Sequence, residues 1–207
     1  MTVGQGDIFD KVFHFGAEAA RVVLASALWL VFSLPLVTLP AATVGAYALI
    51  VAHLADGDKQ YAKPFFTGFR RSFATATLPG LLMIVLVVLT GFNAWYYAAT
   101  GRAGHLSWLL AVVQALLCAG VAGLASGYFA LVARRVTTDE PPSAKVVVKD
   151  VLVTWGPHPR LCCGVVGVVV GVPTLFVWLG FWQFMVFAVG IIVYAVSWLL
   201  VRVERSR

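Results

Sequence analysis

Charged residues are scarce in this chain, which excludes an ordinary soluble protein. Only 12% of its 207 residues are Asp, Glu, Lys or Arg, whereas 61% are hydrophobic. Soluble globular domains contain about 25% charged and about 45–50% apolar residues. The chain also has long uncharged runs, which are typical of helices that cross a bilayer. We therefore predict an all-α membrane protein with a single integral-membrane domain over residues 1–207.

Cysteine is also rare, and no sequence pattern indicates catalysis or metal binding. The three cysteines, Cys118, Cys162 and Cys163, lie in or beside apolar segments at spacings that do not suit a metal. The metalloprotease, serine-hydrolase and phosphate-loop motifs are missing. No Asp, Glu, Lys or Arg is predicted at bilayer depth, which argues against a proton relay or an ion-coupled transporter. We expect no enzyme activity, no metal and no cofactor.

Two prolines in the middle of one apolar run predict a helical hairpin. The run 22–55 is uncharged, and as one helix it would be roughly 51 Å long at about 1.5 Å per residue. A bilayer core is only about 30 Å thick. Pro35 and Pro40 interrupt the run because each removes a helix donor. Ser33 and Thr38 are expected to hydrogen-bond the backbone groups that the bend leaves free.

Three further uncharged runs supply the remaining predicted membrane helices. The last run, 161–201, is too long for one crossing and is expected to turn near residues 180–183. Pro173 should kink the helix before that turn. Together with the hairpin, these runs give a polytopic bundle of about six transmembrane helices. The predicted spans are about residues 19–35, 40–55, 78–98, 107–133, 161–179 and 183–201.

The first polar connection leads into a basic, aromatic amphipathic segment. Phe65, Phe69 and Phe73 repeat at a four-residue spacing, and Arg70 and Arg71 lie off that stripe. Two interpretations stay open. The favoured one is an interfacial segment that packs under the bundle, and the other is a cytoplasmic helix that docks a partner.

A second amphipathic helix is predicted in the connection 134–160. Val147, Val151 and Trp155 fall on its apolar side, whereas Lys145 and Lys149 fall on the opposite side. If the chain has a protein partner, we expect this helix and the segment around Phe65 to contact it on the cytoplasmic side.

Small residues at a four-residue spacing mark two of the predicted membrane helices. Gly123 and Gly127 form one such stripe, and Gly167 and Gly171 form another. Stripes of this kind let two helices approach closely. Contacts within the bundle and contacts between chains both stay open, and contacts within the bundle are favoured.

The placement of positive charge predicts the orientation. Six crossings put both termini on one side, and with the termini inside, all of the 15 Lys and Arg except Arg102 are cytoplasmic. The net charge of +6 is therefore interpreted as a topology signal, and nucleic acid is not an expected partner. We expect the first helix to start before Arg21, with that side chain extending to the membrane interface.

The proline hairpin also carries a family resemblance. Residues 28–47 contain W-L-V-F-S-L-P-L-V-T followed by A-A-T-x-x-A-Y, which resembles the signature of the bacterial YesL-like membrane proteins, a family of unknown function. The resemblance continues through the Phe65–Phe73 segment and, more loosely, through residues 149–160. Two features depart from the family pattern, since no Asn precedes the Trp and a proline stands where many relatives have Gly. The signature residues in this chain are Trp29, Ser33, Pro35, Thr38 and Pro40.

The resemblance implies a location and a role. Such proteins are often encoded beside carbohydrate ABC transporters and are thought of as accessory membrane components. It therefore implies a multi-pass protein of the bacterial cytoplasmic membrane, with importer permease subunits as partners and no known catalytic residues. The alternative is a small permease or channel that acts by itself, although residues 134–160 lack the E-A-A-x-x-x-G type of coupling signature found in importer permeases.

Overall fold

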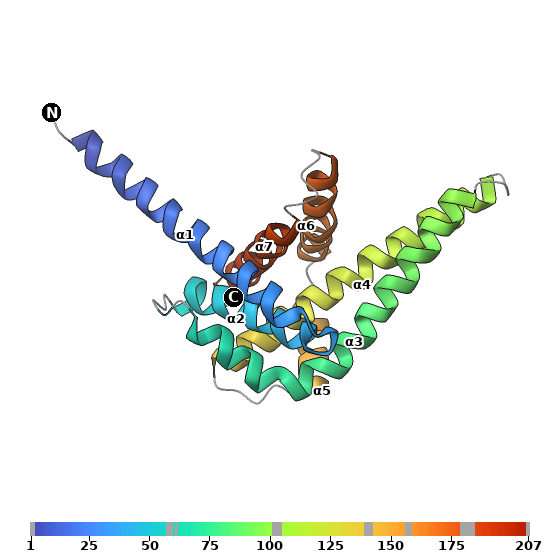
Figure 1. Ribbon diagram of the computed structural model, residues 1–207, viewed down its shortest axis with the longest axis horizontal. Coiled ribbons are helices and arrows are strands. Elements are labelled where there is room, and N and C mark those ends of the chain that lie inside the picture. Colours follow the sequence, from blue (N-terminus) through green and yellow to red (C-terminus); the bar gives the residue numbers. More distant parts are fainter. Residues whose placement is uncertain are drawn as a thin grey trace.

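The computed structural model describes residues 3–56, 60, 62–100, 105–138, 143–155, 159–178 and 185–205, with side chains from residue 16 onward except for a few such as Trp155. Within these residues the chain forms helices and no strand, which confirms the predicted all-α class (Figure 1). The elements are α1 Val3–Ser33, η1 Leu36–Thr38, α2 Leu39–Asp56, α3 Lys63–Thr100, α4 His105–Thr137, α5 Ala144–Trp155, α6 Pro159–Trp178 and α7 Met185–Arg205.

The hairpin between α1 and α2 lies where the two prolines predict it. The Thr38 hydroxyl donates to the carbonyl oxygens of Phe32 and Pro35, at 2.5 and 2.7 Å. The Ser33 hydroxyl donates to the carbonyl oxygen of Trp29 at 2.5 Å. Both residues therefore satisfy backbone groups at the bend, as expected. Pro40 does not precede α2 but occupies its second position, where a proline costs no intrahelical hydrogen bond.

The amphipathic segment around Phe65 and the predicted span 78–98 are one continuous helix, α3. The sequence suggested two separate elements. Before Leu78 the hydrophobic residues lie on one side of the helix, whereas after it they lie on all sides. Pro79 lies inside the helix at this point, and Figure 1 shows α3 bending midway along its length. A proline inside a helix removes one hydrogen bond and bends the helix without ending it. The two halves of α3 therefore run in different directions.

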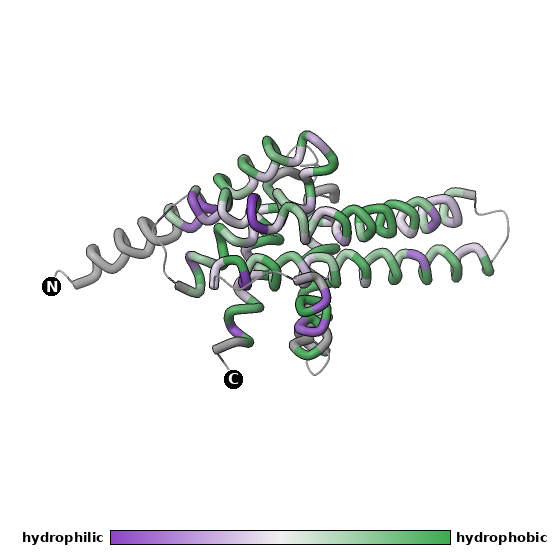
Figure 2. Tube along the Cα trace, turned by 90° about the horizontal axis from the view of Figure 1, so that it is seen from below, coloured by the Kyte–Doolittle hydropathy of each residue, from purple (hydrophilic) through white to green (hydrophobic). Residues whose placement is uncertain are grey.

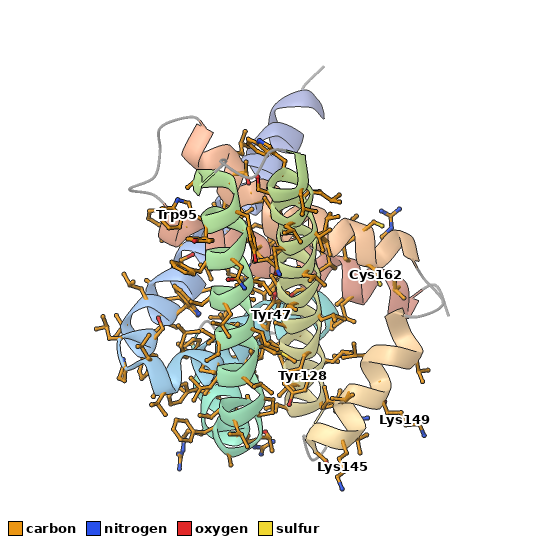
Figure 3. All side chains as sticks on the ribbon, turned by 90° about the vertical axis from the view of Figure 1, so that its right-hand side faces the viewer. Tyr47, Trp95, Tyr128, Lys145, Lys149 and Cys162 are labelled. Carbon is orange, nitrogen blue, oxygen red and sulfur yellow. The ribbon has the colours of Figure 1, made fainter. Side chains whose placement is uncertain are left out.

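Helix α2 is the centre of the fold. In the apolar 18-residue window of its span 67% of the residues are buried, compared with 11% in the corresponding windows of α3 and α4. It contacts α1, α3, α4 and α7, as expected for a helix that is apolar on every side. The largest fully buried side chains are Tyr47 of α2, Tyr128 of α4 and Phe65 of α3. The two tyrosines are labelled in Figure 3.

The second half of α3 and the first half of α4 extend away from this core as a long antiparallel pair, the α3–α4 hairpin (Figure 1). Hydrophobic residues cover most of both helices (Figure 2). The large exposed apolar side chains include Leu82, Val85, Leu89, Phe92, Leu109, Val112, Leu116 and Leu117. A soluble monomer rarely exposes a contiguous apolar surface of this kind, so the hairpin is suited to a hydrocarbon environment.

Four helical stretches are long and apolar enough to cross a membrane: Gly16–Ser33, Leu36–Ala55, Lys63–Ala99 and Leu106–Thr137. The described apolar parts of α6 and α7, Cys162–Leu175 and Phe187–Val203, are shorter. The predicted turn at 180–183 falls outside the described residues, between the end of α6 and the start of α7. The count of six crossings and the cytoplasmic location of both termini stay predictions.

Candidate functional site

Three ionisable side chains meet between α1 and α2. Nε2 of His53 lies 2.7 Å from Oε1 of Glu18 and 3.1 Å from a guanidinium nitrogen of Arg21. A ring nitrogen this close to a carboxylate carries the hydrogen and donates it, so His53 donates to Glu18. Arg21 lies 3.6 Å from the same oxygen. The carboxylate therefore accepts a hydrogen bond from the His53 ring on α2 and forms an ion pair with Arg21 on its own helix.

The cluster corrects the prediction for Arg21. Its side chain was expected to extend to the membrane interface, but only 11% of it is exposed, and it turns toward Glu18 and His53. Glu18 and His53 are also about four-fifths buried, at 20% and 19% exposed. Burying a charge is costly unless it is paired, and this cost holds the three side chains together.

A cavity of about 530 Å³ opens beside the cluster. Glu18 and His53 form one part of its wall, and Tyr194, Trp198 and Arg202 of α7 form another. The α7 residues follow a four-residue spacing and therefore share one helix face. The guanidinium carbon of Arg202 lies 4.9 Å from the centre of the Trp198 ring, a cation–π contact.

The lining of this cavity can bind a polar ligand. It presents a carboxylate, an imidazole and an aromatic face, which together can hold a polar ligand. Among the described residues, no three His, Cys, Asp or Glu side chains are arranged to hold a metal ion. Two buried atoms of the cluster, Oε2 of Glu18 and Nδ1 of His53, have no hydrogen-bond partner in the described part of the chain.

The signature residues of the hairpin lie together and shape the bend. The Trp29 indole donates to the Thr43 hydroxyl at 3.0 Å and so joins α1 to α2. Pro35 is exposed on the outside of the bend, whereas Pro40 is buried beside Gly80 of α3. The contacts of these residues are structural, and none of them lines the charged cavity.

The residues predicted to dock a partner divide into buried and exposed groups. Phe65 is fully buried, with its ring 5.5 Å from that of Phe32, and Phe69 packs partly buried beside it. These two rings attach α3 to the α1–α2 hairpin, as the interfacial interpretation expects, and Phe65 is not available to a partner. Phe73 is 39% exposed. The side chain of Trp155 lies outside the described residues.

The two arginines of the same segment face a surface depression. This basic depression has a volume of about 760 Å³ and is lined by Lys63, Phe66, Thr67, Arg70 and Arg71. Its lining includes no acidic side chain among the described residues. The α3 segment is therefore apolar toward the core and cationic on its outer side.

The predicted glycine stripes have different environments. A Cβ at Gly123 would lie 2.6 Å from Cγ2 of Val166, so α4 and α6 approach closely there. Gly127 is buried as well. Gly167 and Gly171 are exposed, and a Cβ at either would meet no described atom within 4 Å. Of the two stripes, the first makes a close helix contact within the chain.

Three further glycines, which sequence reasoning did not select, also make close helix contacts. A Cβ at Gly68 would lie 2.7 Å from Cβ of Ala48, and Gly80 lies directly against Pro40, so α3 packs tightly along α2. Gly190 lies in the same way against Ser26 where α7 crosses α1. Gly68 and Gly80 belong to a series of small buried residues at a four-residue spacing, together with Ser72 and Ala76. That spacing is a signal that sequence reasoning did not use, whereas Gly190 belongs to no such series.

The long apolar helices and the exposed α3–α4 hairpin define a helical membrane protein. Residues 22–94 match the model of a family described as "Protein of unknown function, DUF624". The match begins in α1, includes all of α2 and ends in the second half of α3, so it covers the proline hairpin and the basic depression. The chain matches no curated protein and no solved structure. The match is consistent with the resemblance carried by residues 28–47 and assigns no activity.

Proposed function

We propose that the chain is a non-enzymatic accessory component of a bacterial carbohydrate uptake system of the ABC type. The observation that supports an accessory role is the α3–α4 hairpin, whose large apolar side chains are mostly uncovered by the rest of the chain. Such a surface can contact lipid and also the membrane helices of another protein. The carbohydrate assignment and the bacterial cytoplasmic membrane come from the YesL-like resemblance.

Helix α5 provides the surface for a cytoplasmic partner in this proposal. Val147 and Val151 are buried against the bundle. Arg135 of α4 fixes the helix by an ion pair with Asp150, with nitrogen–oxygen distances of 2.5 and 2.8 Å. Lys145 and Lys149 point away from the bundle, at the opposite end of the molecule from Trp95 (Figure 3). A rigidly held helix with two outward lysines suits an acidic partner surface.

The test is affinity purification of the tagged full chain from its native membrane in mild detergent, with mass spectrometry of the proteins that co-purify. We expect an importer permease subunit in near-stoichiometric amount. Lys145→Gln combined with Lys149→Gln should remove it, because the outer face of α5 loses both charges. In this proposal the α3 segment no longer contacts the partner, because Phe65 and Phe69 pack into the core. Arg70→Gln combined with Arg71→Gln therefore removes the same charge from α3 and should leave the partner bound. A chain that elutes alone, or a partner retained equally by both variants, would contradict the proposal.

The charged cavity supports one alternative, a small permease or channel that acts by itself. The wall of this cavity carries ionisable and aromatic side chains from three helices, α1, α2 and α7. Uptake of a radiolabelled sugar into proteoliposomes containing only this chain would favour the alternative. Absence of flux, with a permease recovered in the affinity purification, would favour the accessory role.

A further inference from the structure

The basic depression concentrates positive charge on one side of α3. Lys63, Thr67 and Arg70 follow one another at spacings of four and three residues, so their side chains lie on one helix face, and Arg71 lies next to them. Lys63, Arg70 and Arg71 are exposed. Among the described residues, neither Lys63 nor Arg70 takes part in an ion pair.

The described residues that line the depression include no acidic side chain. Three cationic side chains and one hydroxyl line it, together with the exposed edge of Phe66. Guanidinium groups hold phosphate oxygens through paired N–H donors, and an ammonium group adds a further donor. The depression is therefore complementary to an anion with several oxygens, and phosphate is the group that this donor set suits best.

An apolar surface begins directly beside the depression. Leu78 follows Arg71 by seven residues and so lies on the same face of α3, where 78% of its side chain is exposed. Phe73 is 39% exposed nearby along the helix. Beyond the bend at Pro79, most residues of the α3–α4 hairpin are hydrophobic (Figure 2). A ligand bound in the depression therefore has its charged group among the cationic side chains. An apolar tail of that ligand can reach the exposed apolar side chains of α3.

We propose that the basic depression binds the phosphate headgroup of an anionic phospholipid, whose acyl chains lie along the exposed apolar side of α3 from Leu78 onward. The headgroup oxygens accept hydrogen bonds from Lys63, Arg70 and Arg71. A basic segment at the boundary of an apolar helix is the position at which anionic headgroups are met. This site is independent of the accessory role and of any protein partner.

The test is native mass spectrometry of the purified full chain in detergent, titrated with phosphatidylglycerol or phosphatidylcholine. We expect phosphatidylglycerol to bind more tightly than phosphatidylcholine. Arg70→Gln combined with Arg71→Gln should weaken phosphatidylglycerol binding about tenfold, since each basic group near an anionic headgroup contributes several-fold in affinity. Lys145→Gln combined with Lys149→Gln removes the same charge from α5 and should bind phosphatidylglycerol as the wild type does.

Two further measurements, on a lysine variant and with inorganic phosphate as competitor, show whether a loss of binding reflects the proposed site. Arg70→Lys combined with Arg71→Lys retains the charge and should recover most of the binding, which distinguishes loss of the site from loss of the fold. Inorganic phosphate at millimolar concentration should not displace phosphatidylglycerol. Equal binding by the glutamine variant of α3 and the wild type would overturn the proposal. Displacement by inorganic phosphate would also overturn it, in favour of a site for a free anion.

Discussion

Replacing Phe65 by alanine tests how α3 is attached to the core. The ring is fully buried, lies 5.5 Å from the Phe32 ring and stacks on Phe69 at 6.3 Å between centroids. Its ring atoms also face Gly45 of α2. The substitution would leave a cavity where α1, α2 and α3 meet, and Gly45, the facing residue of α2, has no side chain to fill it.

The expected loss follows from the burial. A Phe→Ala change at a fully buried site costs about 3–5 kcal/mol. For a chain of this size about 1 kcal/mol lowers the melting temperature by about 2–4 °C, so the melting temperature should fall by roughly 6–20 °C. Phe92 is 59% exposed on the α3–α4 hairpin, and Phe92→Ala should change stability by no more than about 0.5 kcal/mol.

Thermal unfolding in detergent, followed by the intrinsic fluorescence of the seven tryptophans, measures both variants under the same conditions. We expect Phe65→Ala to melt well below the wild type and Phe92→Ala to melt within about 2 °C of it. If the two variants melt at the same temperature, Phe65 does not pack as the structure describes, and the attachment of α3 through its aromatic stripe is wrong.

Three other substitutions test separate contacts. Thr38→Val removes the hydroxyl that caps the bend and should lower the melting temperature by about 2–4 °C, for a loss of about 1 kcal/mol; an unchanged melting temperature would show that the bend does not need it. Gly123→Ala should destabilise the protein through overpacking, whereas Gly167→Ala should stabilise it by up to about 1 kcal/mol through helix propensity; shifts of the same sign would contradict the assigned contacts. Asp150→Asn removes the carboxylate that pairs with Arg135 and should raise amide hydrogen exchange in α5 about fivefold, for a loss of about 1 kcal/mol in a partly exposed pair; unchanged exchange would mean that α5 is held by its buried valines alone.

Signals that depend on local chemistry predicted the fold well. Two prolines inside an uncharged run located the bend between α1 and α2, because a proline acts on its own backbone and on the residue before it. The same reasoning did not predict that α3 continues past Leu78. Pro79 bends that helix and does not end it, and the neighbouring α2 and α4 stabilise both halves in a way that sequence periodicity does not record.

The charged cavity was not predicted because its members are far apart in the chain. Glu18 and His53 are on different helices, and each is at a polar edge of its apolar run. A usable signal does exist in the hairpin itself. Residues 18 and 53 are nearly equidistant from the bend at Leu36–Thr38. Antiparallel packing of α1 on α2 therefore places these two residues next to each other. An acid and a histidine at matched distances from a predicted bend are therefore worth testing as a pair.

The close-packing glycines show the same limit. The stripe at Gly123 was predicted because it repeats, and its contact with α6 is present. Gly80 and Gly190 make closer contacts than Gly123. Gly80 ends the buried series of small residues that starts at Gly68, which the sequence analysis did not select, whereas Gly190 lies in no repeat, and its role depends on the partner helix. A four-residue spacing is a pattern within one helix. Whether two helices approach closely also depends on the residues of the second helix.

The most direct measurement for the central claim, that this is a membrane protein with the α3–α4 hairpin in the bilayer, is spin-label accessibility in proteoliposomes. The label is placed at Leu86, Leu116 or Lys145 in a chain whose three cysteines are replaced by serine. Leu86 and Leu116 are exposed apolar residues of the hairpin, and Lys145 is on the outer face of α5. If the hairpin is in the bilayer, the first two labels will collide with oxygen and be protected from a water-soluble nickel complex, whereas the label at Lys145 will show the reverse. Equal access of the nickel complex to all three positions would contradict the membrane assignment.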